Sequence, residues 1–358
     1  MKKLHIETGS RTGHLRPSVL MIYTGGTLGM VFDEQTKALV PFNFEQIMEN
    51  VPELRRLNFD LTVMMLAQPI DSSNVTPEDW MQLAELIHDQ FNEYGAFVIL
   101  HGTDTMAYTA SALSFLLENV SKPIVLTGAQ LPIGVARTDA RENLFTALEI
   151  ATAQIDGRPV VPEVCIYFNG FLLRGNRSKK VESSQFDAFH SENYPYLATI
   201  GISIEYNFPY IKPYRPDLPL RLHTRWEKEV LILKLFPGIS SQFIRQLVSL
   251  PGLKGLVLET YGAGNAPTDP EFLQVLEEAI QKGIVVINVS QCTGGRVVQG
   301  SYETSVGLGR IGVISGKDLT VEAAVTKLMF LLGENPEPAV VRYRMSLPIC
   351  GEMEEGEG

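Results

Sequence analysis

Short, continuously apolar runs alternate with longer segments of helical periodicity along most of the chain, and this alternation constrains the fold more than any other feature. A continuous apolar run is typical of a strand covered by helices on both faces, as in a parallel sheet. The pattern therefore predicts an α/β fold built from right-handed βαβ units. The predicted strands are Ser18–Tyr23, Ala96–Leu100, Ile124–Leu126, Glu163–Phe168, Val230–Phe236, Gly255–Leu258 and Ile284–Val289.

Helix start signals lie between these runs. Thr76-Pro77-Glu78-Asp79 combines a capping threonine, a proline in the first turn and an acid three residues on, which favours a helix that ends near Tyr94. Asp269-Pro270 and Thr320 mark two further starts. The expected helices cover about 76–94, 106–119, 138–154, 269–283 and 320–332.

The length of 358 residues suits two domains. Pro209, Pro213, Pro216 and Pro219 interrupt a segment that has no helical period, which favours a linker there. We expect a larger N-terminal domain with a doubly wound, mostly parallel sheet and a smaller, flavodoxin-like C-terminal α/β domain. The expected parts are a flexible leader (1–17), the N-terminal domain (18–206), the linker (207–228), the C-terminal domain (229–347) and a disordered acidic tail (348–358).

Charge and cysteine usage disfavour several classes of protein. The 30 basic residues against 41 acidic ones give a net charge of −11, whereas a nucleic-acid surface needs clustered Lys and Arg. The N-terminal residues lack the apolar core of a secretory signal, and no run of 18 apolar residues exists to span a membrane. Cys165, Cys292 and Cys350 are odd in number and far apart, which favours reduced thiols in the cytoplasm over disulfides or a zinc site.

Small hydroxyl and glycine residues gather after the predicted strands, where ligands bind in open α/β sheets. Thr24-Gly25-Gly26-Thr27, His101-Gly102-Thr103-Asp104 and Thr127-Gly128-Ala129-Gln130 each follow a strand, and Asp71-Ser72-Ser73 precedes a helix. The chain has no G-x-x-x-x-G-K-[ST], no G-x-G-x-x-G after a strand, no H-E-x-x-H and no G-x-S-x-G. Nucleotide-binding, zinc-protease and α/β-hydrolase interpretations therefore lack a motif.

A threonine hydroxyl becomes a nucleophile when a neighbour accepts its proton, and a desolvated lysine can do so. Thr24 and Thr103 are candidates, with Asp104 adjacent and Lys179-Lys180 downstream. Each signal also has a structural interpretation, namely a turn, a helix N-cap or a solvated lysine pair, and His101 is expected to be a structural hydrogen-bonding residue. The residues alone indicate a polar site of Thr, Ser and Asp and leave its chemistry open.

Two segments stand out, Ile22-Tyr23-Thr24-Gly25-Gly26-Thr27-Leu28-Gly29-Met30 and His101-Gly102-Thr103-Asp104-Thr105-Met106-Ala107. They resemble the two signatures of the bacterial-type L-asparaginases, most closely the cytosolic type I branch. The resemblance runs from about Val19 to Met345 and implies hydrolysis of L-asparagine to L-aspartate and ammonia, with no cofactor or metal. Supporting segments are Asp71-Ser72-Ser73, Thr127-Gly128-Ala129-Gln130, Arg174-Gly175-Asn176-Arg177, Tyr261-Gly262-Ala263-Gly264-Asn265-Ala266-Pro267 and Gln291-Cys292.

The resemblance implies a role for each matching residue. Thr24 would be the primary nucleophile and form a β-aspartyl acyl-enzyme, and Lys180 would be the general base that acts on Thr103 or on a bound water. Lys180 is chosen over Lys179 because the family lysine falls three positions after the residue that matches Arg177. The substrate-binding residues would be Asp71 and Asp104 for the α-ammonium, Ser72 for the α-carboxylate, Ser73 lining the same pocket, and the Thr103 N–H with Ala129 near the amide that is cleaved.

The resemblance also points to a tyrosine from a second copy of the chain. The family's flap often carries a tyrosine, but residues 31–40 contain none. Type I relatives can supply one from the C-terminal domain of the neighbouring subunit, and Tyr302 matches that segment. We expect Tyr302 to complete the site across the interface of a homodimer or homotetramer. Tyr302→Phe should therefore lower kcat/KM for asparagine, and a wild-type value would refute this role.

Two positions bear on regulation. Some cytosolic relatives bind a second asparagine at the subunit interface, through an Arg ahead of the Tyr-Gly segment and a Thr ahead of the lysine. This chain has Glu259 and Lys179 there. Because an Arg-to-Glu exchange inverts the charge that faces a ligand carboxylate, we expect hyperbolic asparagine kinetics, with a Lys179–Glu259 pair filling the pocket. A Hill coefficient clearly above one in a substrate titration would contradict this expectation.

Three alternatives stay open. A glutaminase-asparaginase is the nearest, since one methylene of substrate length is worth only about 1–3 kcal/mol of discrimination. The asparaginase-like subunit of a tRNA-dependent amidotransferase would need a further N-terminal domain and an RNA-binding surface, which the acidic balance disfavours. A non-catalytic amino-acid-binding protein is disfavoured by the presence of Thr24, Thr103, Asp104 and Lys180.

Overall fold

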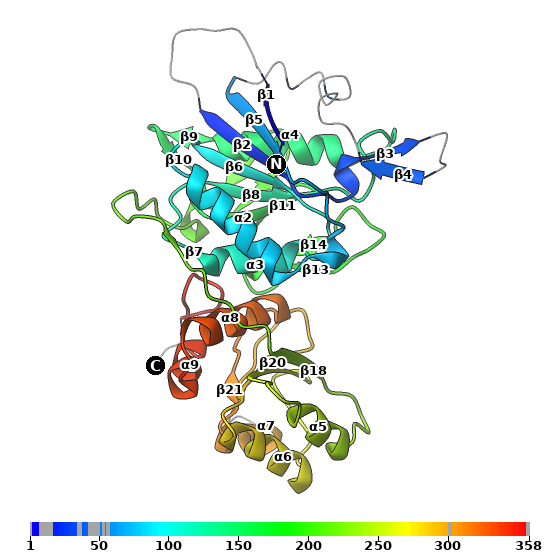
Figure 1. Cartoon of the computed structure of the whole chain (residues 1–358), viewed down its shortest axis with the longest axis vertical. Coiled ribbons are helices and arrows are strands. Elements are labelled where there is room, and N and C mark those ends of the chain that lie inside the picture. The colour runs from blue at the N-terminus through cyan, green and yellow to red at the C-terminus, as the bar shows by residue number, and fades with distance from the viewer. Residues whose placement is uncertain are drawn as a thin grey trace. The chain divides into compact units, whose positions relative to one another are not determined.

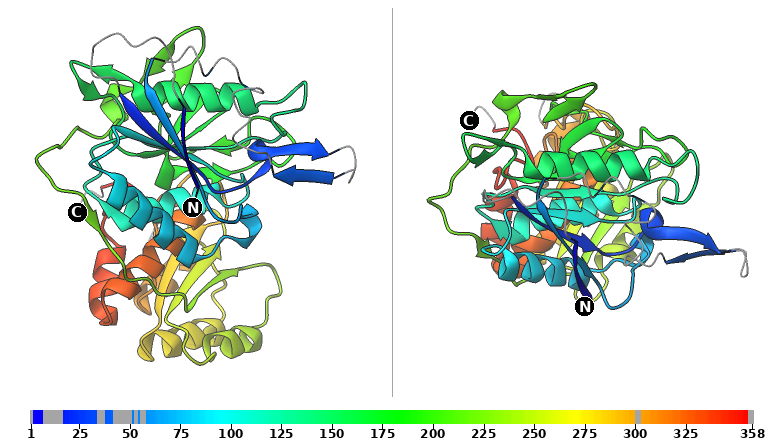
Figure 2. Two further views of the ribbon diagram at one scale, coloured as in Figure 1. Left: turned by 45° about the horizontal axis from the view of Figure 1, so that its top comes forward. Right: turned by 90° about the horizontal axis from the view of Figure 1, so that it is seen from above.

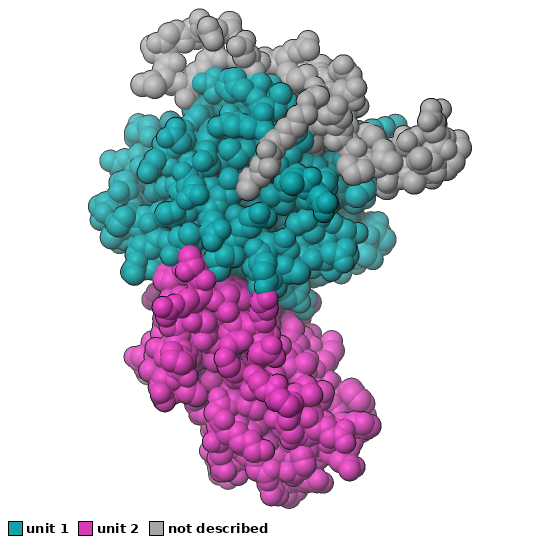
Figure 3. Space-filling model, in the orientation of Figure 1, with its two compact units in different colours: residues 1–222 teal, residues 223–358 magenta. Residues whose placement is uncertain are grey.

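The structure is a computed structural model that describes residues 2–6, 17–33, 38–41, 51, 54, 58–299 and 303–355. The chain forms two compact units, Met1–Leu222 and His223–Gly358, which are coloured separately in Figure 3. Each unit has its own sheet and its own apolar core. The expected two-domain α/β architecture is confirmed.

The described part of unit 1 is built around a nine-stranded sheet (Figure 1). Its strands, in spatial order, are β1 (Lys2–Ile6), β5 (Asp60–Met65), β2 (Ser18–Tyr23), β6 (Ala96–Leu100), β8 (Ile124–Thr127), β11 (Val164–Phe168), β12 (Phe171–Arg174), β15 (Ala198–Ile200) and β16 (Ile204–Tyr206). The strands from β5 to β11 run parallel, and antiparallel strands extend both edges. The parallel strands therefore have the doubly wound order 2-1-3-4-5, whose direction reverses between β2 and β6.

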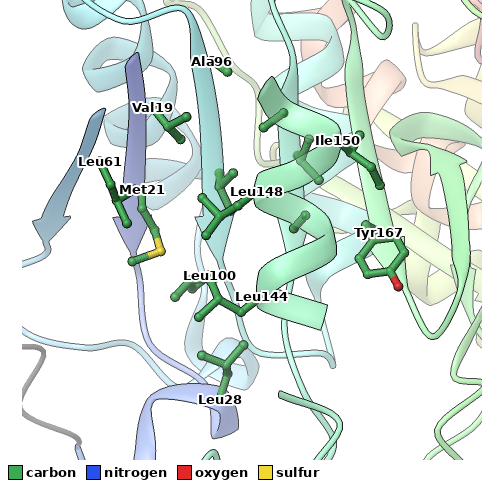
Figure 4. Packing of buried hydrophobic residues seen from close by; sticks show 14 of the residues in the cluster. Val19, Met21, Leu28, Leu61, Ala96, Leu100, Leu144, Leu148, Ile150 and Tyr167 are labelled. Carbon is green, nitrogen blue, oxygen red and sulfur yellow. The ribbon is translucent and has the colours of Figure 1, made fainter. Parts of the chain in front are cut away.

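The described helices of unit 1 cover both faces of this sheet. They are α2 (Pro77–Gln90), α3 (Met106–Leu116) and α4 (Ala140–Thr152). The capping box predicted at Thr76 is present, since the Asp79 carboxylate accepts from the Thr76 N–H at 2.7 Å. Figure 4 shows Leu144 and Leu148 of α4 packed against Met21 and Leu100, all fully buried.

One helical connection differs in hand from the others. α2, α3 and α4 connect β5 to β6, β6 to β8 and β8 to β11, and all three connections move in the same direction across the sheet. α4 packs on the sheet face that carries Met21 and Leu100, whereas α2 and α3 lie on the opposite face (Figures 1 and 2). Connections that move in the same direction but use opposite faces of a sheet have opposite hands. The expectation that all βαβ units are right-handed is therefore wrong for at least one of the three. The loop before α4 crosses the carboxyl edge of the sheet to reach the other face.

Short elements complete the described part of unit 1. They are the pairs β3 (Met30–Asp33) with β4 (Ala38–Pro41), β7 (Leu117–Glu118) with β17 (Arg221–Leu222), β9 (Gln154–Ile155) with β10 (Arg158–Pro159) and β13 (Lys179–Lys180) with β14 (Phe189–His190), and the 3-10 turns η1 (Thr27–Gly29), η4 (Ser72–Asn74), η5 (Gly175–Arg177) and η6 (Phe208–Tyr210). The β7–β17 pair corrects the expected linker, because residues up to Leu222 are held on unit 1. The buried Glu163 carboxylate also accepts from the Lys212 N–H at 2.8 Å.

The expected flexible leader needs a correction over Lys2–Ile6. These residues form β1, which pairs antiparallel with β5. Leu4 and Ile6 alternate with polar residues and therefore share one face, where both pack against the main core. This short alternation is the strand signal that the sequence interpretation missed.

Unit 2 has a four-stranded parallel sheet among its described residues, in the order β18 (Val230–Lys234), β19 (Gly255–Thr260), β20 (Val285–Ser290) and β21 (Ile314–Ser315). The expected smaller C-terminal α/β domain is thus confirmed, and its parallel strands follow one another in chain order. Residues of the α5, α6 and α7 helices share one core with the sheet, and α8 packs on the sheet as well. The helices are α5 (Ser241–Val248), α6 (Pro270–Gln281), α7 (Glu303–Arg310), α8 (Val321–Glu334) and α9 (Pro338–Met345).

The acidic tail is also corrected, because the structure describes it up to Glu355 and buries Glu352 and Met353. Glu352 is fully buried and forms a 2.7 Å ion pair with Lys327 of α8, which is fully buried too. The sequence shows only a run of acids, which is usually a solvated face. It gives no sign that one of them pairs with a lysine inside a hydrophobic helix.

Candidate active site

The candidate site lies at the carboxyl ends of β2 and β6, where the strand order of unit 1 reverses. Thr24 directly follows β2 and is almost fully buried. Its N–H and its Oγ1 both donate to the Leu100 carbonyl at the end of β6, at 3.1 and 2.9 Å. Its own carbonyl accepts from the Ile70 N–H at 2.7 Å. Thr24 is thus fixed between β6 and the loop that carries Asp71.

Two glycines allow three loops to meet backbone to backbone. Gly25 and Gly26 have φ of +134° and +89°, a region that side chains other than glycine rarely adopt. A Cβ on Gly25 would lie 2.1 Å from the Ile70 carbonyl oxygen, and one on Gly26 would lie 2.5 Å from the Gly102 Cα. The loops after β2 and β6 and the loop before η4 are therefore in direct contact, which brings the segments carrying Thr24, Ser72 and Thr103 together.

Lys180 links the two polar residues that follow Gly102. Its Nζ donates to Thr103 Oγ1 at 2.8 Å and to Asp104 Oδ1 at 2.7 Å. The lysine and the threonine are largely buried, whereas the Asp104 side chain is 62% exposed. Lys180 reaches Thr103 from the two-residue strand β13, where it pairs with Phe189 and Lys179 pairs with His190. Successive residues of a strand point to opposite faces, so Lys179 faces away from this cluster.

The Asp71–Ser73 turn forms another wall of the site. Asp71 caps η4, and its Oδ1 accepts from the Ser73 N–H at 3.0 Å and from the Ser73 hydroxyl at 2.8 Å. These two hydrogen bonds, the backbone one first, lower the pKa of Asp71 and keep it ionised. Ser72 is buried against Gly102, where an added Cβ would lie 2.4 Å from Ser72 Oγ. Ser73 is exposed.

The loop after β8 is held over the site by residues that the sequence interpretation missed. Asp139 accepts from the Gln130 N–H at 2.9 Å and from the Leu131 N–H at 3.0 Å. Asn143, fully buried one helical turn later, donates to the Gly128 carbonyl at 3.0 Å. The buried Ala129 therefore lies in a loop with a fixed path. The four-residue spacing of Asp139 and Asn143 at the start of α4 was the available signal.

His101 is a structural hydrogen-bonding residue, as expected. It is 1% exposed, its Nδ1 lies 2.7 Å from the Gly102 carbonyl oxygen, and its Nε2 lies 3.0 Å from Thr109 Oγ1. Burial lowers the pKa of this imidazole, because an imidazolium would lose its hydration there. The neutral ring therefore prevails at neutral pH.

At the carboxyl edge of the unit 2 sheet, side chains donate hydrogen bonds to backbone carbonyls of neighbouring segments. Gln291 Nε2 donates to the Leu235 carbonyl at 2.7 Å and to the Glu259 carbonyl at 2.9 Å. Ser290 Oγ donates to the Gly262 carbonyl at 2.6 Å. The Glu259 carboxylate lies 3.9 Å from Lys234 Nζ. Its pairing with Lys179 stays a prediction, and Tyr302 lies outside the described residues.

No group of three or more His, Cys, Asp or Glu side chains among the described residues is placed to hold a metal ion. No helix within them combines the length and the apolar character needed to cross a bilayer.

Residues 18–212 match the family described as asparaginase, N-terminal, and residues 229–345 match the glutaminase/asparaginase C-terminal domain. The chain belongs to the asparaginase family. This asparaginase-family chain is 41% identical over 344 residues to L-asparaginase 1 of Escherichia coli (strain K12), across 94% of this chain and 98% of the relative. It is 40% identical over 337 residues to the 60 kDa lysophospholipase of Mus musculus, across 88% of this chain and 58% of that longer protein.

The asparaginase fold is also seen among solved structures. L-asparaginase I from Vibrio cholerae O1 biovar eltor superposes with a TM-score of 0.86 at 38% identity. The match covers 95% of this asparaginase-family chain and all of that one. The two-unit organisation described above is thus shared with a structure named as an asparaginase.

Proposed function

We propose that this chain is an L-asparagine amidohydrolase that releases L-aspartate and ammonia. The observation that carries the proposal is the contact of Lys180 Nζ with Thr103 Oγ1 and Asp104 Oδ1 beside the buried Thr24 loop. Family membership and the full-length match to L-asparaginase 1 support the same activity.

The reaction divides into two steps, because a covalent intermediate replaces one difficult step by two easier ones. The Thr24 hydroxyl attacks the side-chain amide carbon, ammonia leaves with the proton that the hydroxyl gives up, and a β-aspartyl ester remains on Thr24. Water then cleaves this ester and frees aspartate. Lys180 acts as the general base on Thr103 or on this water, for which its 2.8 Å contact with Thr103 is suited.

A small zwitterion needs one anchor for each charge. Asp71 and Asp104 would hold the α-ammonium, and the lowered pKa of Asp71 keeps its carboxylate charged for this purpose. Ser72 would donate to the α-carboxylate, and the exposed Ser73 would line the same pocket. The Thr103 N–H, with Ala129 nearby, would stabilise the oxyanion.

A homodimer or homotetramer and a cytoplasmic location belong to the same proposal. Tyr302 of a second copy would complete the site. The free thiols Cys165, Cys292 and Cys350 support a reducing compartment. Sizing by light scattering and cell fractionation would test the two statements.

The decisive experiment is an ammonia-release assay with L-asparagine and with L-glutamine. We expect kcat/KM to favour asparagine by about 10–200-fold, the range that one methylene can supply. Near-equal values would indicate a glutaminase-asparaginase. Asparagine binding without ammonia release above the Thr24→Ala background would indicate a non-catalytic binding protein instead.

A further inference from the structure

A chain of buried hydrogen bonds runs from α2 through α3 to the loop after β6. Trp80 Nε1 donates to Thr109 Oγ1 at 3.0 Å, and Thr109 Oγ1 lies 3.0 Å from His101 Nε2. His101 Nδ1 lies 2.7 Å from the Gly102 carbonyl oxygen. Trp80 is 7% exposed, His101 1% and Thr109 0%, so water does not compete for these bonds.

The two groups at the ends of this series of hydrogen bonds, the Trp80 indole N–H and the Gly102 carbonyl, fix the position of every hydrogen between them. Indole Nε1 can only donate and a carbonyl oxygen can only accept, so His101 Nδ1 carries a hydrogen that it gives to Gly102. Thr109 accepts a hydrogen bond from Trp80, and its own hydroxyl donates one to Nε2 of the neutral ring. The Gly102 carbonyl therefore fixes the tautomer in which Nδ1 is the donor, and Thr109 supports this tautomer by donating to the unprotonated Nε2.

The orientation of the Gly102 carbonyl also sets the orientation of the Thr103 N–H, because both groups belong to the same peptide. The Gly102 C=O and the Thr103 N–H belong to one planar trans peptide and point in opposite directions. Glycine has the least restricted backbone, and no larger residue fits here, since a Cβ would lie 2.4 Å from Ser72 Oγ. A hydrogen bond to the Gly102 oxygen therefore restricts the rotation that would move the Thr103 N–H.

We propose that Trp80, Thr109 and His101 are positioning residues that aim the Thr103 N–H at the oxyanion formed during asparagine hydrolysis. This inference rests on the proposed function. The Thr103 N–H gains its strongest bond only when charge develops on the substrate oxygen, so its misalignment should reduce kcat and leave KM nearly unchanged.

Two variants with amide side chains test the roles of the two ring nitrogens of His101 separately. His101→Asn places an amide nitrogen near the position of Nδ1 and keeps a donor for Gly102, whereas His101→Gln places its amide near Nε2 and keeps only the Thr109 contact. We expect kcat for asparagine to fall about 10²-fold in His101→Gln, as when an oxyanion donor is lost, and clearly less in His101→Asn. Thr109→Val, which removes only the hydroxyl, should lower kcat by several-fold.

KM and the affinity for L-aspartate should stay within about threefold of wild type in all three variants, because the binding of the charged groups is unaltered. His223→Gln is the matched control. It alters a partly buried histidine that bonds Glu334 in unit 2, and kcat should not change. Equal kcat in His101→Asn and His101→Gln, or losses shared equally by KM and kcat, would overturn the positioning role. A wild-type chain that releases no ammonia would instead overturn the proposed function and this inference with it.

Discussion

Lys180→Met is expected to lower kcat for asparagine by about 10³-fold, within the range for loss of a general base, while KM changes by no more than about threefold. The amine donates to Thr103 at 2.8 Å and to Asp104 at 2.7 Å, and methionine keeps the length of the side chain without a proton acceptor. The Asp104 carboxylate remains available for the substrate ammonium. Steady-state ammonia release measures both constants.

Lys179→Met is the matched control, since it removes the same charge from the neighbouring residue on the other face of β13. Its kcat should stay within about twofold of wild type. Intact-mass analysis adds a second readout. If Lys180 activates the water that cleaves the acyl-enzyme, the β-aspartyl ester on Thr24 should accumulate in Lys180→Met. Similar kcat values in the two variants would contradict the role of Lys180.

The parts of the fold that depend on local pattern could be predicted from the sequence. β2 and β6 are continuous apolar runs, and Thr76 and Asp79 form the capping box that starts α2. The polar loop after β2 follows from the rule that ligands bind beyond the carboxyl ends of parallel strands. The resemblance, and not a local pattern, singles out Lys180. In the structure Lys180 contacts Thr103, whereas Lys179 is the preceding residue of β13 and lies on its other face.

The parts that depend on partners distant in the chain could not be predicted. The hydrogen bonds of His101 lead through Thr109 of α3 to Trp80 of α2, two partners on different helices. Asn143 donates to the Gly128 carbonyl, a backbone atom that leaves no mark in the sequence. The face on which α4 packs depends on the path of the preceding loop. The burial of Glu352 depends on Lys327, which a helical pattern would place on a solvated face.

Lys327→Met is expected to lower the free energy of unfolding by about 3–5 kcal/mol, because it leaves a buried carboxylate without its counter-ion. Lys327 Nζ also donates to the Met345 and Leu347 carbonyls, at 3.1 and 2.5 Å, so the lysine connects α8 to the end of α9 and to the chain just beyond it. Glu352 in turn accepts from the Ile349 and Cys350 N–H groups, at 2.9 and 2.8 Å. Chemical denaturation of the full chain measures the effect.

The matched control is an exposed ion pair that a neighbouring residue of the tail forms. Arg296 lies 3.4 Å from Glu354, and both side chains are more than half exposed. Glu354→Gln should change the free energy of unfolding by less than about 1 kcal/mol. The double variant Lys327→Met/Glu352→Leu should recover most of the loss, since a buried pair replaced by apolar side chains of similar size is often neutral. A double variant as unstable as Lys327→Met would show that the backbone hydrogen bonds of Lys327 and Glu352, and not the charge pairing between them, hold the tail.

Acid titration gives an independent check on the pair. Burial alone would raise the pKa of Glu352, but the Lys327 ammonium and the hydrogen bonds to the carboxylate lower it below the ordinary value. A carboxyl with a depressed pKa in the folded state stabilises the fold fully above its unfolded pKa of about 4.3, and that contribution is lost as the pH falls through the lower folded value. Wild type should therefore lose stability below about pH 4 by more than the double variant does, because the double variant has no carboxyl to protonate at this position. If the free energy of unfolding fell equally for the two proteins below about pH 4, Glu352 would not be ionised in the folded state.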